Sequence, residues 1–325
     1  MNAKLFLLAT LSIPAFAFNE SKYLFQRPAM NDKLIVFGFA GDLWSVGRTG
    51  GTAVRLTTGI GVETDPVFSP DGTQIAFTGN YDGNTDVFLM PSTGGIPRRL
   101  TYHPGPDFAV AWTPDGKGVI FRSGRDSKSP RYTQLFSVPV EGGLAKALPL
   151  PMAYAGSYST EGKRFAYTPV GGGSGFNYAN YVSWRRYRGG LASSIQITVM
   201  PDLNTTKVPR EGSNDFNPLW VGDRLYFLSD RNGPVTLFRY DTDSGKVSEV
   251  IRNNGYDIRS ASAGPGGIVY DQFGEIFLFD TKSGKSRKVP IEIASDFPEV
   301  RPHLEDVSRN IQFSRISPTG MRALF

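Results

Sequence analysis

The chain has 325 residues, 40% of them hydrophobic and 20% charged, so it can bury a core and is not a disordered polymer. It contains no cysteine, which excludes disulfides, thiolate catalysis and cysteine-bound metal sites. A formal net charge of +5 is small beside 35 basic and 30 acidic residues, so nucleic-acid binding is not indicated.

The first segment, residues 1–17, has the pattern of a secretory signal peptide. Lys4 precedes an apolar run over residues 5–13, and Ala-Phe-Ala at 15–17 fits a small-residue cleavage site. The run is too short to span a bilayer, and a buried first strand, the alternative, is opposed by Pro14. We therefore expect an exported protein, periplasmic or secreted, with no membrane span after the signal is removed.

A Pro-Asp-Gly turn between two apolar strands occurs in "FSPDGTQIAF" (68–77) and again in "WTPDGKGVIF" (112–121). Proline presets φ at the second turn position and glycine takes the left-handed conformation that closes a β-hairpin. Aligning on the final aromatic residue gives seven copies, the first spanning residues 22–37. They end at Phe37, Phe77, Phe121, Tyr167, Phe227, Tyr270 and Phe325.

A second hairpin lies between successive copies, as in "DLWSVGRTGGTAVRL" and "EIFLFDTKSGKSRKV". Two hairpins in roughly 40–45 residues make four antiparallel strands, the spacing of a β-propeller blade. Six complete units predict an all-β, six-bladed propeller over residues 18–310. An open solenoid is the alternative, although it would need polar caps at both ends. The seventh hairpin, residues 311–325, predicts the first half-blade of a second propeller and therefore a truncated chain.

The sequence contains no recognisable catalytic motif. His103 and His303 are its two histidines, both in Pro-rich loops and neither beside a nucleophile motif. "GGSGF" at 172–176 does not fit G-x-S-x-G, and the Gly-rich segment 171–175 lacks the Lys-Ser/Thr pair of a phosphate-binding loop. One aspartate per turn does not make a calcium site. We therefore predict no catalytic residue, no metal and no cofactor in this chain.

The segment from Trp184 to Arg188 has the most unusual chemistry, and it lies in an insertion of the fourth unit. Its guanidinium groups could clamp a carboxylate or phosphate, because arginine offers planar, bidentate donors. Alternatively, they stack on aromatic rings and hold the inserted loop against the propeller. The candidate substrate-binding residues are Trp184, Arg185, Arg186 and Arg188. Basic residues form no stripe, so we expect no nucleic-acid partner.

Several segments resemble the N-terminal six-bladed propeller of tricorn-type proteases: "DKLIVFGFAGDLWSV", "AWTPDGKGVIFRS", "WRRYRGG" and "VGDRLYFLSDRNG". The Pro-Asp-Gly repeats alone would match any TolB-like propeller, whereas the tryptophan with "YRGG" and "VGDRLYFLSDR" are more specific. The resemblance covers residues 22–325. Archaeal members carry an arginine pair before the third hairpin that is proposed to anchor a peptide C-terminus, and residues 103–108 here contain no arginine.

The resemblance implies a non-catalytic propeller that guides or binds peptides or unfolded polypeptide. Tricorn-type proteases are large serine peptidases whose catalytic domains follow two propellers, and nothing in this chain matches those domains. Proteolysis would therefore be carried out by a longer parent chain. Whether that parent chain forms a homo-oligomer is left open by the sequence. Two alternatives remain: a free-standing TolB-like periplasmic propeller that binds proteins, and the propeller of a prolyl-oligopeptidase-like enzyme.

Overall fold

A computed structural model describes residues 23–127, 129, 132–170, 187–190, 192–200, 202–296, 302, 304 and 306–324. The chain divides into two compact units, Met1–Ile293 and Ala294–Phe325. In the described residues, no helix has both the length and the apolar character needed to cross a membrane.

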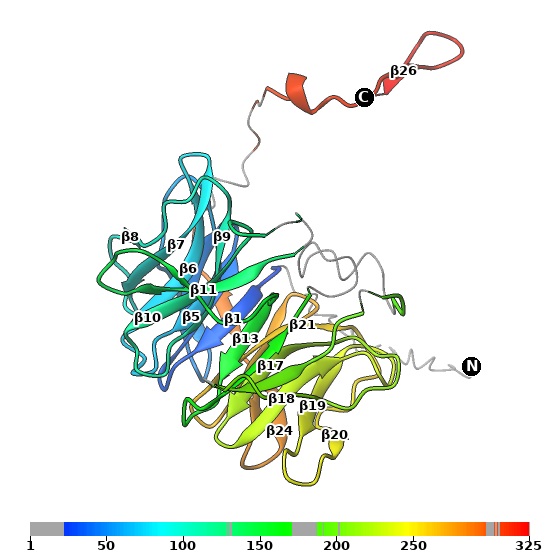
Figure 1. Cartoon of the computed structure of the whole chain (residues 1–325). Helices are drawn as coiled ribbons and strands as arrows, with labels where there is room; N and C mark the ends of the chain where they lie inside the picture. Colours follow the sequence, from blue (N-terminus) through cyan, green and yellow to red (C-terminus); the bar gives the residue numbers. More distant parts are fainter. Residues whose placement is uncertain are drawn as a thin grey trace, which may run out of the picture. The chain divides into compact units, whose positions relative to one another are not determined.

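The described residues of the first unit form six blades, each of four antiparallel strands in chain order (Figure 1). The first strands surround the centre: β1 (Gln26–Met30), β5 (Val62–Phe68), β9 (Asp107–Trp112), β13 (Ala155–Tyr158), β17 (Asp215–Val221) and β21 (Ile258–Gly264). Each contacts the next, and β21 contacts β1, so the ring is closed. The predicted six-bladed propeller is therefore confirmed, and an open solenoid is excluded.

The remaining strands of each blade follow outward from the centre. The second strands are β2 (Leu34–Phe39), β6 (Gln74–Tyr81), β10 (Gly118–Ser123), β14 (Arg164–Thr168), β18 (Arg224–Ser229) and β22 (Gly267–Gln272). The third strands are β3 (Asp42–Gly47), β7 (Asn84–Pro91), β11 (Gln134–Pro139), β15 (Gln196–Val199), β19 (Thr236–Tyr240) and β23 (Glu275–Asp280). The fourth strands are β4 (Gly51–Arg55), β8 (Arg98–Arg99), β12 (Lys146–Ala147), β16 (Thr205–Lys207), β20 (Val247–Glu249) and β24 (Lys285–Lys288).

The aromatic residue that aligns the repeats is buried on the second strand of every blade. Four of these rings stack on an aromatic residue of the third strand, with centroids 5.3–6.0 Å apart: Phe77 on Phe88, Phe121 on Phe136, Phe227 on Phe238, and Tyr270 on Phe277. Buried apolar clusters lie between neighbouring blades and join them. A single blade would expose both of its faces, so the ring is the unit that buries the core.

The Pro-Asp-Gly turns form as the sequence predicts. Gly72 and Gly116 have φ of +71° and +69°, where a side chain would be strained. Asp71 accepts hydrogen bonds from the Ser69 hydroxyl at 2.6 Å and from the Thr73 amide at 3.0 Å. The bond from Ser69 is the main reason that the pKa of Asp71 is lowered. The aspartate therefore has a structural role in the turn.

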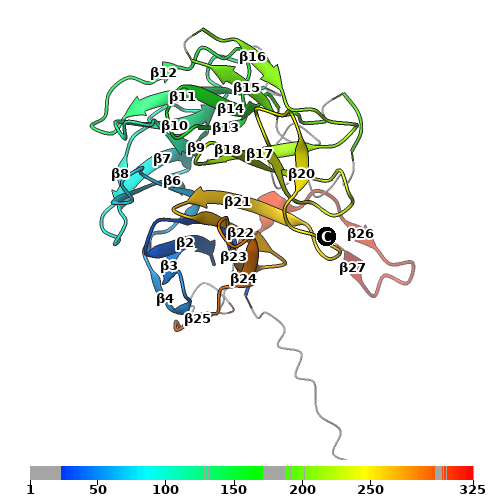
Figure 2. The ribbon, with the colours of Figure 1, turned by 90° about the horizontal axis from the view of Figure 1, so that it is seen from below.

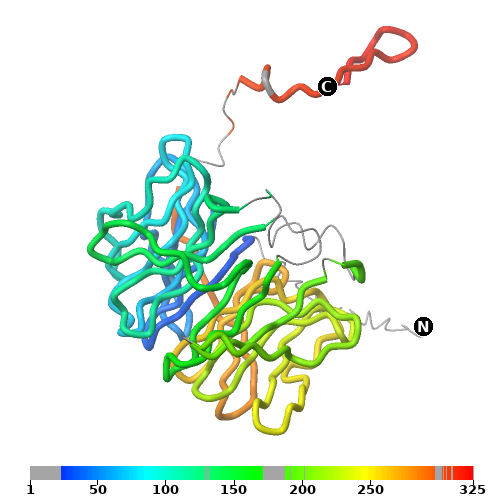
Figure 3. The backbone as a smooth tube through the Cα atoms, in the orientation of Figure 1, coloured from blue at the N-terminus to red at the C-terminus, as the bar shows by residue number. Residues whose placement is uncertain are grey.

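One further strand of the first unit, outside the four strands of each blade, fastens the last blade to the first. β25 (Ile291–Ile293) pairs in parallel with β4, the outer edge of the first blade (Figure 2). Next to this pairing, the Gly51 amide donates to the Pro290 carbonyl at 2.9 Å, and the Arg287 guanidinium donates to the Arg48 carbonyl. The blades follow one another in chain order (Figure 3), so this outer strand and the β1–β21 contact close the ring.

The second unit contains η3 (Ser308–Asn310) and a hairpin of β26 (Arg315–Ile316) and β27 (Ala323–Leu324). The hairpin turns at Gly320, whose φ of +72° matches those of the Pro-Asp-Gly turns. A hairpin therefore forms within residues 311–325. That it begins a second propeller stays a prediction.

Candidate functional site: the central cavity

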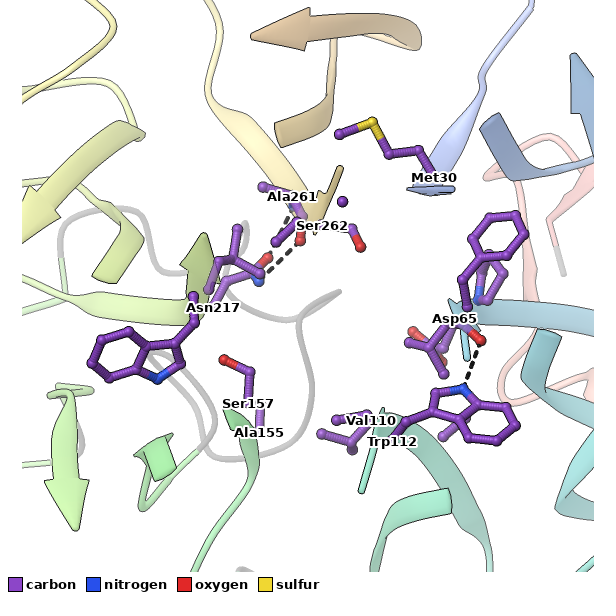
Figure 4. Close-up of a pocket in the computed structure, with 18 of the residues that line it drawn as sticks. Met30, Asp65, Val110, Trp112, Ala155, Ser157, Asn217, Ala261 and Ser262 are labelled. Carbon is purple, nitrogen blue, oxygen red and sulfur yellow. Dashed lines mark hydrogen bonds between the residues drawn. The ribbon is translucent and has the colours of Figure 1, made fainter. Parts of the chain in front are cut away.

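The first strands of all six blades enclose a cavity of about 590 Å³, called the central cavity below (Figure 4). Residues of the Pro-Asp-Gly turns, such as Asp71 and Pro114, contribute to its lining. Trp112, Ser157 and Asn217 come from three different blades and all line it. A cavity of this size accommodates a small molecule or a short stretch of extended polypeptide.

Three of the first strands contain an X-Pro step with a bulge in the strand pairing. Arg27, Asp65 and Asn217 precede prolines and have φ of +49°, +53° and +53°, which is unusual for residues other than glycine. The register of β1, β5 and β17 shifts at these steps. Bulges re-aim side chains, and here all three residues line the central cavity.

The bulged residues bond to the neighbouring blade. Arg27 forms an ion pair with Asp65 of the second blade. The Asn217 amide group donates to the Ala261 carbonyl and accepts from the Ala261 amide, both at 3.0 Å, which ties the fifth blade to the sixth (Figure 4). The Trp112 indole likewise donates to the Val67 carbonyl at 3.0 Å. Side-chain bonds between blades therefore fix the wall of the cavity.

The wall formed by the sixth blade holds a buried carboxyl group. Asp271, on β22, is 3% exposed and accepts a hydrogen bond from the Ser260 hydroxyl. Burial raises the pKa of Asp271 to about 6, although the Ser260 hydrogen bond and the charges of Arg259 and Arg27 oppose the shift. This wall therefore carries acidic and basic groups that compensate one another.

The sequence-predicted binding cluster is only partly within the described residues. Trp184, Arg185 and Arg186 lie outside them. The Arg188 guanidinium donates to the buried carboxylate of Asp230 at 2.8 Å, and Asp230 also accepts from the Asn214 amide. Arg188 thus fastens one end of the insertion to the fifth blade, in line with the structural alternative. Its role in substrate binding stays a prediction.

The described residues that line the cavity include serines but no histidine. His103 lies in a loop, where its Nδ1 atom accepts a hydrogen bond from the Gly105 amide at 2.9 Å. His303 lies outside the described residues. In the part of the chain that the structure describes, no three histidine, aspartate or glutamate side chains are placed to hold a metal ion.

The residues that line the cavity are not among those predicted from the sequence, although two sequence patterns mark some of them. The first is the X-Pro step shared by "RPAM", "DPVF" and "NPLW", which begin at Arg27, Asp65 and Asn217. The second is a charged residue directly after the aligned aromatic, which occurs at Arg122 and Asp271. Neither pattern follows from hairpin periodicity, because the X-Pro steps interrupt the strand pairing and the residue after the aromatic is not repeated from blade to blade.

These features define a six-bladed propeller with a partly charged central cavity. A family model described as the tricorn protease N-terminal beta propeller domain matches residues 22–285. The chain belongs to this family.

Similar proteins agree with this assignment. Tricorn protease homolog 1 of Streptomyces coelicolor is 29% identical over 278 residues, which cover 82% of this chain and 24% of the homolog. The tricorn protease homolog of Saccharolobus solfataricus is 25% identical, over 88% of this chain and 26% of its own length. The chain therefore spans about a quarter of the length of these relatives.

Solved structures show the same fold. The crystal structure of the tricorn protease aligns with a TM-score of 0.72 at 23% identity, covering 82% of this chain and 26% of that chain. A putative TolB from Agrobacterium tumefaciens aligns with a TM-score of 0.57 at 20% identity, covering 71% of this chain and 82% of that chain.

Proposed function

We propose that this chain is the non-catalytic propeller region of a tricorn-like serine peptidase and that its central cavity receives peptides. Proteolysis would take place in domains of a longer parent chain. The observation that carries the proposal is the family match over residues 22–285, which includes all six first strands around the cavity. A cavity of about 590 Å³ with polar groups along its wall suits an extended peptide better than a folded protein.

We also propose that the chain is exported, because residues 1–17 have the composition of a signal peptide. Mass spectrometry after cell fractionation should find the protein outside the cytoplasm with Phe18 as its first residue, and protein that stays in the cytoplasm with an intact N-terminus would contradict export.

Peptide binding is tested by filling the cavity. Ser262 lies on β21 in the cavity wall (Figure 4), so a Ser262→Trp variant places an indole where a peptide would lie. Val54, on β4, is 62% exposed and serves as the matched site for a Val54→Trp control. Fluorescence anisotropy with short, labelled, unstructured peptides should show binding by the wild type and the control, and loss of binding in Ser262→Trp with an unchanged melting temperature.

Two results would contradict the proposal. Equal binding by both tryptophan variants would place the peptide outside the cavity. Reproducible cleavage of the peptides by the purified chain, sensitive to serine-protease inhibitors, would refute the non-catalytic part.

A second candidate is a TolB-like propeller that binds a folded protein. The observation in its favour is an exposed aromatic pair, Tyr256 and Phe273, whose rings stack at 4.0 Å while both side chains are more than half exposed. Exposed stacked aromatics are typical of protein contact surfaces. Capture of a defined folded partner that is lost in Phe273→Ala, but kept in Ser262→Trp, would favour this function over the first.

A further inference from the structure

One position of the repeat is occupied by five different residue types in the six blades. It follows the aligned aromatic on the second strand and is occupied in turn by Gly38, Thr78, Arg122, Thr168, Leu228 and Asp271. Arg122 of the third blade and Asp271 of the sixth are the charged members, and both line the central cavity. In a closed ring of six blades, the third blade lies opposite the sixth, so the two charges belong to opposite walls.

Arg122 is buried without a counter-charge. The residue is 7% exposed, and its guanidinium carbon lies 4.5 Å from the centroid of the Phe108 ring and 3.9 Å from that of Tyr154. Within the described residues these two ring contacts are the interactions of its side chain, with no hydrogen bond or ion pair to the guanidinium. The two rings hold the guanidinium in place but leave its N–H donors unused.

Three half-buried arginines of the propeller show what Arg122 lacks. Arg99, Arg125 and Arg231 each donate to a buried aspartate, respectively Asp86, Asp107 and Asp215. Arginine donors that lie out of contact with water are costly unless they are paired. Arg122 has no paired carboxylate among the described residues and lines the central cavity, and none of its nitrogen atoms is among the buried polar atoms without a partner, so its donors face the cavity.

Asp271 does not supply the missing charge. Its nearest partners are on its own side of the cavity, namely the Ser260 hydroxyl and the charges of Arg259 and Arg27. The charges in the wall of the sixth blade therefore compensate one another, whereas Arg122, in the wall of the third blade, has no counter-charge among the described residues.

We propose that Arg122 binds a carboxylate group of a peptide in the central cavity. The proposal rests on the proposed function and narrows its substrate class to peptides with an acidic side chain or a free C-terminus. A guanidinium presents parallel N–H donors that match the two oxygens of a carboxylate. The contacts with the Phe108 and Tyr154 rings use none of the N–H donors as hydrogen bonds to a carboxylate, so the donors stay available to a ligand. Low solvent exposure strengthens the resulting ion pair.

The test compares three peptides of the same length and labelling. One is neutral with both ends blocked, the second has an internal glutamate with blocked ends, and the third has a free C-terminal carboxylate. Each is titrated against the wild type, Arg122→Gln and Arg252→Gln, the last being an exposed arginine outside the cavity lining that controls for net charge.

We expect Arg122→Gln to weaken binding of a carboxylate-bearing peptide about tenfold or more and to leave the neutral peptide unchanged. The peptide that loses affinity identifies the source of the carboxylate. Arg122→Lys should bind the carboxylate-bearing peptide with an affinity between those of the wild type and Arg122→Gln, because lysine keeps the charge and loses the bidentate geometry. Arg252→Gln should match the wild type.

A probe independent of peptides separates the two proposals. Succinate should raise the melting temperature of the wild type and of Arg252→Gln, relative to sodium chloride of equal ionic strength, but not that of Arg122→Gln. If this holds while no peptide binds the wild type, the anion site stands and the proposed function is wrong. If all three peptides bind wild type and Arg122→Gln equally, or succinate acts on both alike, the assignment of Arg122 is overturned. If Arg122→Gln fails to fold, two other measurements test the assignment. The first is peptide binding by Arg122→Lys, and the second is competition of succinate with each peptide for the wild type.

Discussion

The first and second strands of the blades lie side by side yet differ in almost every respect. The second strands are regular and mostly buried, and they repeat one aromatic position around the ring. The first strands are bulged in five of the six blades, and their polar residues differ from blade to blade. The repeated strands therefore hold the ring together, and the irregular strands give the central cavity its chemistry. Substitutions in the two sets should have different consequences.

The largest effect is expected in a second strand. Phe227 is fully buried between the fourth and fifth blades and stacks on Phe238, so Phe227→Ala leaves a cavity in the core. We expect the free energy of unfolding to fall by about 3–5 kcal/mol. Urea denaturation followed by circular dichroism measures the change.

The matched control is Phe273→Ala, because this ring is 59% exposed at a turn. It should change the free energy of unfolding by no more than about 1 kcal/mol. Similar losses in both variants would show that stacking within blades, rather than burial between them, stabilises the ring.

The next prediction concerns Asp271, which lies on a second strand and also lines the central cavity. Its pKa is raised by burial to about 6 in the folded state, against 3.8 as the ordinary value, so the folded protein holds the proton more tightly. This stability is fully present below the ordinary pKa and is lost as the pH rises through about 6. The wild type should therefore lose up to about 3 kcal/mol of unfolding free energy between pH 4 and 7 through this group.

The variant Asp271→Asn should lack that part of the pH dependence, as measured by urea denaturation across the pH range. Asp241→Asn is a control of opposite sign. Hydrogen bonds from the Ser244 amide and hydroxyl lower the pKa of exposed Asp241, so its contribution is present above the ordinary pKa and is lost as the pH falls. Identical pH profiles for the wild type and Asp271→Asn would contradict the assignment.

Hairpin periodicity is enough to predict the blades, because each repeat contains a similar turn and the same buried aromatic position. The Pro-Asp-Gly turns are local in sequence, and residues such as Asp71 and Gly72 act within a few positions of one another. The cavity depends instead on contacts between blades, such as that of Asn217 with Ala261, 44 positions apart. A repeat pattern cannot reveal such contacts, since they arise only after the ring closes.

The same limit applies to the candidate site. The sequence marks Arg185 and Arg186 because basic residues gather there, whereas the ion pair of Arg188 with Asp230 joins positions 42 residues apart and is visible only in the folded chain. Arg122 is a single basic residue in a mostly apolar strand, so local composition does not mark it as a binding residue. Its importance lies in the absence of a carboxylate among the described neighbours, which only the packed blades can show.

The smallest effect is expected at the bulge of the fifth blade, where Asn217 adopts φ of +53° and holds Ala261 through two hydrogen bonds. Asn217→Ala removes both bonds and keeps a side chain in a left-handed conformation, so the free energy of unfolding should fall by about 2 kcal/mol. Asn217→Gly removes the same bonds without the strain and should cost about 1 kcal/mol less. In both variants the Ala261 amide should lose protection in hydrogen exchange, whereas Asn80→Ala, at an exposed asparagine, should leave that amide protected. If glycine proves as destabilising as alanine, the backbone at this bulge is not strained, and the irregular strands contribute to stability through their side chains alone.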